Sequence, residues 1–136
     1  MIEVSTDPAR LDVGRIHQWL SRDAYWALGR SLDVVRRAIS GSLNVGAYDG
    51  AEQVGYARVV TDRATFAWLC DVYVDPSHRG AGVGTALLDA VDAELDPMGL
   101  TRTLLATADA HDLYARRGFQ QLPADGRFMV RGSNGP

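Results

Sequence analysis

Cysteine is almost absent from this sequence, since Cys70 is the only one among 136 residues. A single cysteine excludes an intramolecular disulfide framework and a zinc site built from thiolates, and it fits a reducing compartment. The amino-terminal segment lacks the basic and apolar regions of a secretory signal, and no uncharged apolar run is long enough to span a bilayer. These absences predict a cytoplasmic protein with no membrane partner.

Excess charge of either sign is also missing. The formal net charge of -3 gives no broad cationic field, which disfavours nucleic acid as the partner. We expect no metal site. Hydrophobic residues make up 46% of the chain, enough for the core of one domain. We therefore predict a single domain over residues 1–132 and a flexible polar tail at 133–136.

The first third of the chain predicts one strand followed by helices. Residues 2–6 have the composition of a short strand, and Asp12 can cap a helix whose apolar residues share one face. A second helical stretch is expected around Tyr25–Leu28. Ser31 can cap a third helix, over residues 32–39.

The middle third predicts three consecutive antiparallel strands. Residues 43–49 and 52–62 flank Asp49-Gly50, a dipeptide typical of tight hairpin turns. Residues 65–74 form another β-branched and aromatic run. The fold class is therefore α+β.

A glycine-rich loop and a long helix follow these strands. The helix should begin near Val83, because apolar residues recur from there at helical spacing up to Leu95. Beyond it we expect a strand over residues 100–107, a short helix over 110–117 and a last strand over 128–131.

The order of strand, arginine, glycines and helix builds an anion site. Glycines at positions 80, 82 and 84 let the backbone approach a ligand and adopt positive φ values. Free N–H groups at the start of the helix, together with the positive end of its dipole, face a diphosphate. Arg79 adds a cation at the edge of this loop.

Three nucleotide-binding motifs compete for this loop. A Walker loop requires a lysine after its last glycine, but Thr85 follows Gly84. The dinucleotide fingerprint requires a third glycine where Thr85 stands, and it opens a βαβ unit rather than following an antiparallel meander. Neither motif fits.

The third motif is the coenzyme A loop of the GNAT superfamily of acyl-CoA N-acyltransferases. The segment Arg79-Gly80-Ala81-Gly82-Val83-Gly84 resembles that loop, and Val72-Tyr73-Val74 resembles the strand that precedes it. A later segment, Ala110–Phe119, resembles the family's Ala-x-x-Leu-Tyr-x-x-x-Gly-Phe pattern. The resemblance spans residues 43–122 in order and spacing.

The resemblance implies a mostly antiparallel central sheet with helices on both faces and a splayed strand pair that forms the coenzyme slot. It implies acetyl-CoA as the acyl donor, with the pantetheine arm bound by the backbone of one slot strand. The residues that it places at the cofactor are Val72, Tyr73, Val74, Arg79, Gly80, Ala81, Gly82, Val83, Gly84, Thr85, Thr107 and Asp109. Thr107 stands where the family often has asparagine, so Thr107 or Asp109 is expected to substitute for that contact.

The resemblance also assigns two catalytic roles in direct transfer to a primary amine. Tyr114 matches the family tyrosine near the coenzyme sulfur, and a phenol with a pKa of about 10 can protonate a thiolate. Asp71 lies on the slot strand and is a candidate general base. Asp75, Asp109 and a water relay stay open as alternatives for the base. The Asp71 carboxylate could also be purely structural, satisfied by nearby backbone N–H groups or by an arginine.

The acceptor is a small-molecule or peptide amine whose identity the sequence does not name. Candidate substrate-binding residues are the aromatic and cationic side chains Tyr25, Trp26, Arg30 and Trp68, which also suit an aromatic core. A homodimer is one assembly that the resemblance allows. A non-catalytic acyl-CoA sensor is the alternative function, although such a protein would not need Tyr114.

Overall fold

The fold is described from a computed structural model, which covers residues 1–124 and 126–132. The chain divides into two compact units, residues 1–105 and 106–136, and each is described by itself. Whether residues 1–132 form one domain stays a prediction. The proposed tail at 133–136 lies outside the described residues.

The first unit is built on a five-stranded sheet in the order β1-β2-β3-β4-β5. Its strands are β1 (Ile2–Ser5), β2 (Leu43–Asp49), β3 (Glu52–Thr61), β4 (Phe66–Val74) and β5 (Arg102–Leu104). The first four pair antiparallel, whereas β5 pairs parallel to β4. The expected α+β fold with an antiparallel meander is confirmed.

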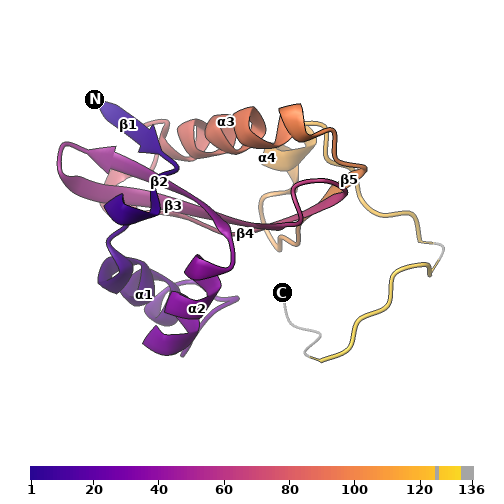
Figure 1. The fold of residues 1–136 in the computed structure, drawn as a ribbon, viewed down its shortest axis with the longest axis horizontal. Coiled ribbons are helices and arrows are strands. Elements are labelled where there is room, and N and C mark those ends of the chain that lie inside the picture. The colour runs from indigo at the N-terminus through magenta and orange to yellow at the C-terminus, as the bar shows by residue number, and fades with distance from the viewer. Residues whose placement is uncertain (125, 133–136) are drawn as a thin grey trace. The chain divides into compact units, whose positions relative to one another are not determined.

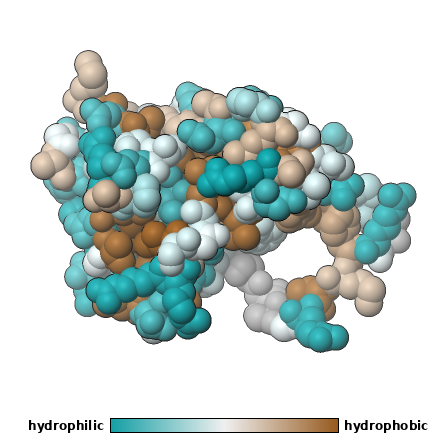
Figure 2. All heavy atoms as spheres, in the orientation of Figure 1, coloured by the Kyte–Doolittle hydropathy of each residue, from teal (hydrophilic) through white to brown (hydrophobic). Residues whose placement is uncertain are grey.

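Helices cover both faces of this sheet (Figure 1). They are α1 (Val13–Arg22) and α2 (Leu32–Ser40) on one face and α3 (Val83–Leu95) on the other. Three short 3₁₀ turns, η1 (Pro8–Arg10), η2 (Pro76–His78) and η3 (Asp96–Met98), lie between these elements. Apolar spheres are visible where α1 and α2 meet the sheet, bordered by hydrophilic ones (Figure 2).

The predicted caps and turns of the first unit are present. The Asp12 side chain accepts a hydrogen bond from the Arg15 N–H, and Ser31 accepts one from the Val34 N–H. Gly50 has φ +62° in the β2–β3 hairpin. The predicted apolar face of α3 is buried along its length, at Val83, Leu87, Val91 and Leu95.

Two predicted elements of the first unit are corrected. Residues 25–28 form a turn rather than a helix, because the local backbone bonds span three residues, from Ala27 N to Ala24 O and from Arg30 N to Ala27 O, and Gly29 has φ +77°. The fifth strand covers only three of the eight predicted residues, because its pairing with β4 ends at Trp68 and Leu104.

The second unit contains α4 (His111–Ala115). The Thr107 hydroxyl accepts hydrogen bonds from the N–H groups of Asp109 and Ala110 and so organises the entry to this helix. The predicted last strand at residues 128–131 is wrong, since none of these residues is in a strand. A β-forming composition yields a strand only where a ladder partner completes it, and none of the described ladders includes this segment.

Candidate active site

The glycine loop after β4 is open to an anion. Gly80 and Gly82 have φ values of +81° and +84°, and a Cβ atom at either position would meet nothing within 4 Å. Gly82 is also the N-cap of α3, and no side chain caps that helix. The N–H groups of Val83 and Gly84, at the start of α3, therefore suit an anionic ligand.

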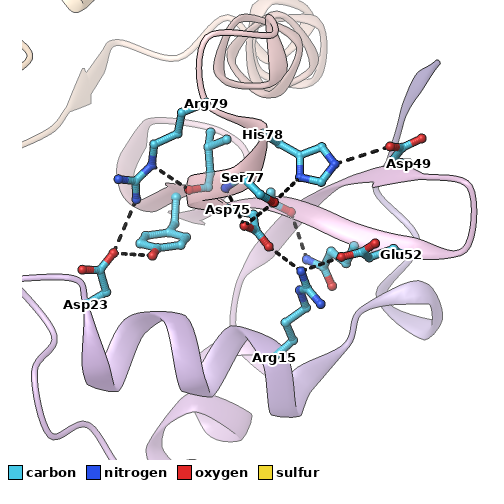
Figure 3. A network of polar contacts seen from close by, with 12 residues as sticks. Arg15, Asp23, Asp49, Glu52, Asp75, Ser77, His78 and Arg79 are labelled. Atoms are coloured by element: carbon cyan, nitrogen blue, oxygen red, sulfur yellow. Dashed lines mark hydrogen bonds and ion pairs between the residues drawn. The ribbon is translucent and has the colours of Figure 1, made fainter.

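The Arg79 side chain folds back onto the end of β4. Its Nε donates to the Val74 carbonyl at 3.0 Å, and its Nη2 lies 3.4 Å from an Asp23 carboxylate oxygen. The guanidinium also lies 5.3 Å above the Tyr73 ring, whose hydroxyl donates to the same carboxylate (Figure 3). Arg79 is thus a fixed part of the loop's frame as well as a charge at its edge.

A second group of polar contacts fixes the turn between β4 and the loop. The Asp75 carboxylate accepts from the backbone and hydroxyl of Ser77, each at 2.9 Å, and pairs with Arg15 of α1 (Figure 3). Burial opposes ionisation of Asp75, but these donors outweigh it and hold its pKa below the usual value. Asp75 is accordingly a poor proton acceptor.

The edge of β4 beyond Trp68 supplies backbone groups for a ligand. On one side of β4, Tyr73 and Val74 pair with Tyr56 and Gly55 of β3. On the other side, the described pairing with β5 stops at Trp68. Backbone groups of Val72–Val74 that point to that side suit an extended chain such as pantetheine.

Asp71 lies at a bulge in β4. Cys70 faces Arg58 and Tyr73 faces Tyr56, so two residues of β4 oppose one of β3. Asp71 has φ +52°, an uncommon value for a residue with a side chain. The bulge turns its carboxylate toward the face covered by α1 and α2, where Arg58 binds it.

The Asp71 carboxylate is surrounded by donors. It accepts from Trp26 Nε1, Arg30 Nη1 and Arg58 Nε, each at 2.8 Å. Its side chain is only 2% exposed. Burial raises its pKa, but the charges and hydrogen bonds of Arg58, Arg30 and Trp26 outweigh burial, and the net shift is downward.

Some of the residues predicted to bind the amine acceptor belong to this cluster, and others lie at the surface. Trp26 and Arg30 bind Asp71, and Tyr25 packs edge-on against Trp26 with ring centroids 5.0 Å apart. Trp68 is 36% exposed and lies two residues before Cys70 on β4. Arg58 is not among the residues predicted from sequence, because one arginine inside a β-rich run gives no signal of its partner.

Within the second unit, Tyr114 is buried in α4. Its ring packs edge-on against Phe119 with centroids 5.8 Å apart, and its carbonyl accepts from the Phe119 N–H at 3.1 Å. These contacts fix the ring that the sequence resemblance identifies as the acid. The described residues hold no group of three or more His, Cys, Asp or Glu side chains that suits a metal ion, and no helix among them is long and apolar enough to cross a membrane.

Comparison with known proteins decides the family. The family model described as "Acetyltransferase (GNAT) family" matches residues 13–119. The chain belongs to the GNAT acetyltransferase family. It is therefore an acyl-CoA-dependent N-acetyltransferase, with acetyl-CoA as its acyl donor.

Individual relatives agree with this assignment. A crystal structure of a GNAT-family protein from Xanthomonas campestris pv. campestris is 49% identical, with a TM-score of 0.94 over 98% of this chain and 94% of that one. A curated acetyltransferase relative from Gibberella zeae is 34% identical over 83% of this chain and 75% of its own length. The N-acetylglutamate synthase of Neisseria gonorrhoeae, solved with coenzyme A and N-acetyl-glutamate, has a TM-score of 0.74 at 19% identity over 93% of this chain and 30% of its own, which is a likeness of fold alone.

Proposed function

We propose that this GNAT acetyltransferase transfers the acetyl group of acetyl-CoA to a primary amine by direct attack while both substrates are bound. The proposal rests on one observation, which is that two surfaces suited to different parts of coenzyme A follow one another along the chain. The open edge of β4 at Val72–Val74 leads through Arg79–Gly82 to the uncapped start of α3. Coenzyme A has its groups in the matching order, with the extended pantetheine arm followed by the diphosphate.

The binding roles follow from that order. The N–H groups over Gly80–Gly84 would bind the diphosphate, while the backbone of Val72–Val74 would bond the pantetheine arm. Asp109 stays a candidate for contact with the cofactor. Because the Thr107 hydroxyl already accepts from two N–H groups, we expect its role to be positioning of this turn.

The reaction needs a neutral amine, a polarised carbonyl and a proton for the leaving thiolate. The amine nitrogen forms a bond to the thioester carbon, the carbon–sulfur bond breaks, and the sulfur keeps the electron pair. Tyr114 would donate its proton to that sulfur and recover one as the amine loses its own. A β4 backbone N–H directed at the thioester oxygen would stabilise the charge that develops there.

For the proton acceptor we favour a water relay over Asp71. A carboxylate that accepts from three donors and whose pKa is lowered has little capacity to take a proton from an amine. Asp75 is also occupied, by Arg15 and Ser77. We therefore assign Asp71 to holding Arg30, Arg58 and Trp26 in place.

An acyl-cysteine route has little support. Cys70 is half-buried, and burial raises the pKa of its thiol to about 11. Such a thiol is protonated at neutral pH and is a weak nucleophile. Direct transfer needs no covalent enzyme intermediate.

The test combines a calorimetric titration with coenzyme A and a screen of primary amines with acetyl-CoA, in which free thiol and acetylated product are both measured. We expect coenzyme A to bind and at least one amine to be acetylated in proportion to thiol released. Binding without turnover on any amine would support the sensor function instead. Absence of binding by folded protein would contradict the proposal at its first step.

A further inference from the structure

The cluster of charged groups around Asp71 holds one more positive charge than negative charge. Arg30 and Arg58 both bind the Asp71 carboxylate, and no other carboxylate pairs with either arginine among the described residues. The remaining titratable groups in the cluster are neutral at pH 7, since burial raises the pKa of the Tyr56 phenol and of the Cys70 thiol. Two guanidinium groups and one carboxylate leave a net charge of +1.

This excess charge is partly shielded from water. The side chains of Arg30 and Arg58 are 21% and 14% exposed. Both border the packed interface between the sheet and the helices, next to the buried apolar side chains of Ile16 and Leu20 of α1 and Val35 of α2. A cation with little hydration in apolar surroundings is stabilised by an anionic ligand more strongly than a fully hydrated one.

The two guanidinium groups also have N–H donors that their contacts with Asp71 and Ser42 do not use. An arginine side chain has five N–H donors. Arg30 directs Nη1 at Asp71, while Arg58 directs Nε at Asp71 and Nη1 at the Ser42 hydroxyl, 3.0 Å away. Asp71 thus holds the arginines in a fixed orientation without using all of their N–H groups, and fixed donors suit a planar carboxylate.

An apolar surface lies beside this charge on the same face of the sheet. Arg58 and Val60 are two residues apart on β3, and Val60 faces Trp68 across the β3–β4 ladder. Phe66 precedes Trp68 by two residues, so it shares that face as well. Val60, Phe66 and Trp68, the apolar patch, are 41%, 38% and 36% exposed.

The distance between the two features suits one small molecule. Residues two apart on a strand are separated by about 7 Å, roughly the distance from the carboxylate to the end of the side chain in a large apolar amino acid. The bulge at Asp71 lies next to Val72, where the exposed β4 edge would hold the thioester. An α-amino group beside a bound carboxylate would therefore be near the reacting carbon.

We propose that the acceptor is an α-amino acid with a free carboxylate and an apolar or aromatic side chain, bound by Arg30 and Arg58 at the carboxylate and by the apolar patch at the side chain. This inference rests on the proposed amine acetylation. It identifies Arg58 as a specificity residue, and it gives Asp71 the task of orienting both arginines.

The first experiment compares a carboxylate with its neutral amide. Coenzyme A-loaded protein is titrated by calorimetry with N-acetyl-L-phenylalanine and with N-acetyl-L-phenylalaninamide, which differ only in the charged group. We expect the acid to bind at least about tenfold more tightly, as a charge-assisted hydrogen bond implies. Equal affinities, or tighter binding of the amide, would overturn the inference.

The second experiment uses turnover of L-phenylalanine and L-phenylalaninamide by wild type, by Arg30→Met and by the control Arg36→Met, which removes an exposed charge of α2. The ratio of variant to wild type for each compound removes the difference in amine basicity. Arg30→Met should raise KM for the acid at least about tenfold and leave KM for the amide within about twofold, while Arg36→Met should change neither.

The outcomes separate the two proposals. If the amide is acetylated as well as the acid, amine acetylation stands and the carboxylate subsite is refuted. If no amine is acetylated but the N-acetyl acid still binds preferentially, the subsite stands and amine acetylation fails. Should Arg30→Met not fold, the acid and amide comparison on the wild-type protein decides the inference alone.

Discussion

Arg58 donates from Nε to the Asp71 carboxylate at 2.8 Å, at the point where β4 bulges out of register with β3. The positive φ of Asp71 costs roughly 1–2 kcal/mol for a residue with a side chain. Its contacts with two arginines and a tryptophan offset that cost. The buried pair of Arg58 and Asp71 therefore connects the bulge in β4 to the positive charge that we propose binds the substrate carboxylate.

Replacing Asp71 with Asn should destabilise the protein. Two guanidinium groups would lose their counterion in a buried position, which costs about 3 kcal/mol. Denaturant unfolding of wild type and Asp71→Asn measures this difference. Asp33→Asn is the matched control, because Asp33 pairs with Arg37 on the surface of α2 with both side chains more than two-thirds exposed, and it should cost less than about 0.5 kcal/mol.

The same pair gives a pH dependence whose sign is fixed. The pKa of Asp71 is lower in the folded protein than its unfolded value of about 3.9, so its contribution is present above that value and is lost as pH falls through the folded pKa. The difference in unfolding free energy between wild type and Asp71→Asn should be constant from about pH 5 to pH 7 and shrink toward lower pH. A difference that grows on acidification would refute the ionised pair.

Gly82→Asp should abolish most binding of coenzyme A. Its carboxylate would stand at the start of α3, where the diphosphate is proposed to bind, so we expect affinity to fall at least about tenfold in calorimetry. Gly99→Asp is the control, because Gly99 also has positive φ and open space around its Cβ position. Both variants should lose similar stability, but only Gly82→Asp should lose affinity. Unchanged affinity in folded Gly82→Asp would leave the loop as a plain turn.

Tyr114→Phe should separate chemistry from binding. A positioned acid contributes about 10²–10⁴-fold, so turnover should fall at least about tenfold while coenzyme A affinity stays within about 1 kcal/mol. Tyr48→Phe is the control, because the buried Tyr48 hydroxyl has no hydrogen-bond partner among the described residues and its removal should affect neither rate nor binding. Equal rates for wild type and Tyr114→Phe, with chemistry rate-limiting, would assign the proton to another group.

Gly55→Ala tests how α3 is seated on the sheet. A Cβ atom at Gly55 would lie 2.9 Å from Val83 Cγ1 and 3.0 Å from Leu87 Cδ1, so these buried side chains of α3 must move. We expect a loss of about 1–3 kcal/mol in unfolding free energy and weaker binding of coenzyme A, because Val83 begins the helix at the loop. Gly41→Ala, whose Cβ atom has only ordinary contacts, should show neither effect. Wild-type affinity in Gly55→Ala would show that the loop is independent of this packing.

Local chemistry explains why much of the fold was predictable. Asp12 and Ser31 cap their helices through their own side chains, and Gly50 and Gly82 take positive φ values where the sequence called for them. Such features depend on a few neighbouring residues. The stripe from Val83 to Leu95 follows from helical periodicity in the same way.

The failed predictions concern segments that depend on distant partners. Residues 128–131 have a strand-forming composition, but a strand exists only where another strand completes the ladder. The turn at 25–28 is similar, because it places Trp26 and Arg30 to bind Asp71, more than 40 residues away. No local periodicity encodes that contact.

The sequence by itself determined the order of elements, the anion-binding loop at Arg79–Gly84 and the family resemblance, because each depends on adjacent residues or on spacing along the chain. Only the tertiary structure decided the environment of Asp71. Whether a carboxylate acts as a base or as a counterion depends on the charges around it, and Arg30 and Arg58 come from segments 41 and 13 residues away. Burial and electrostatic interaction act through space, so folding of the chain fixed the state of this group.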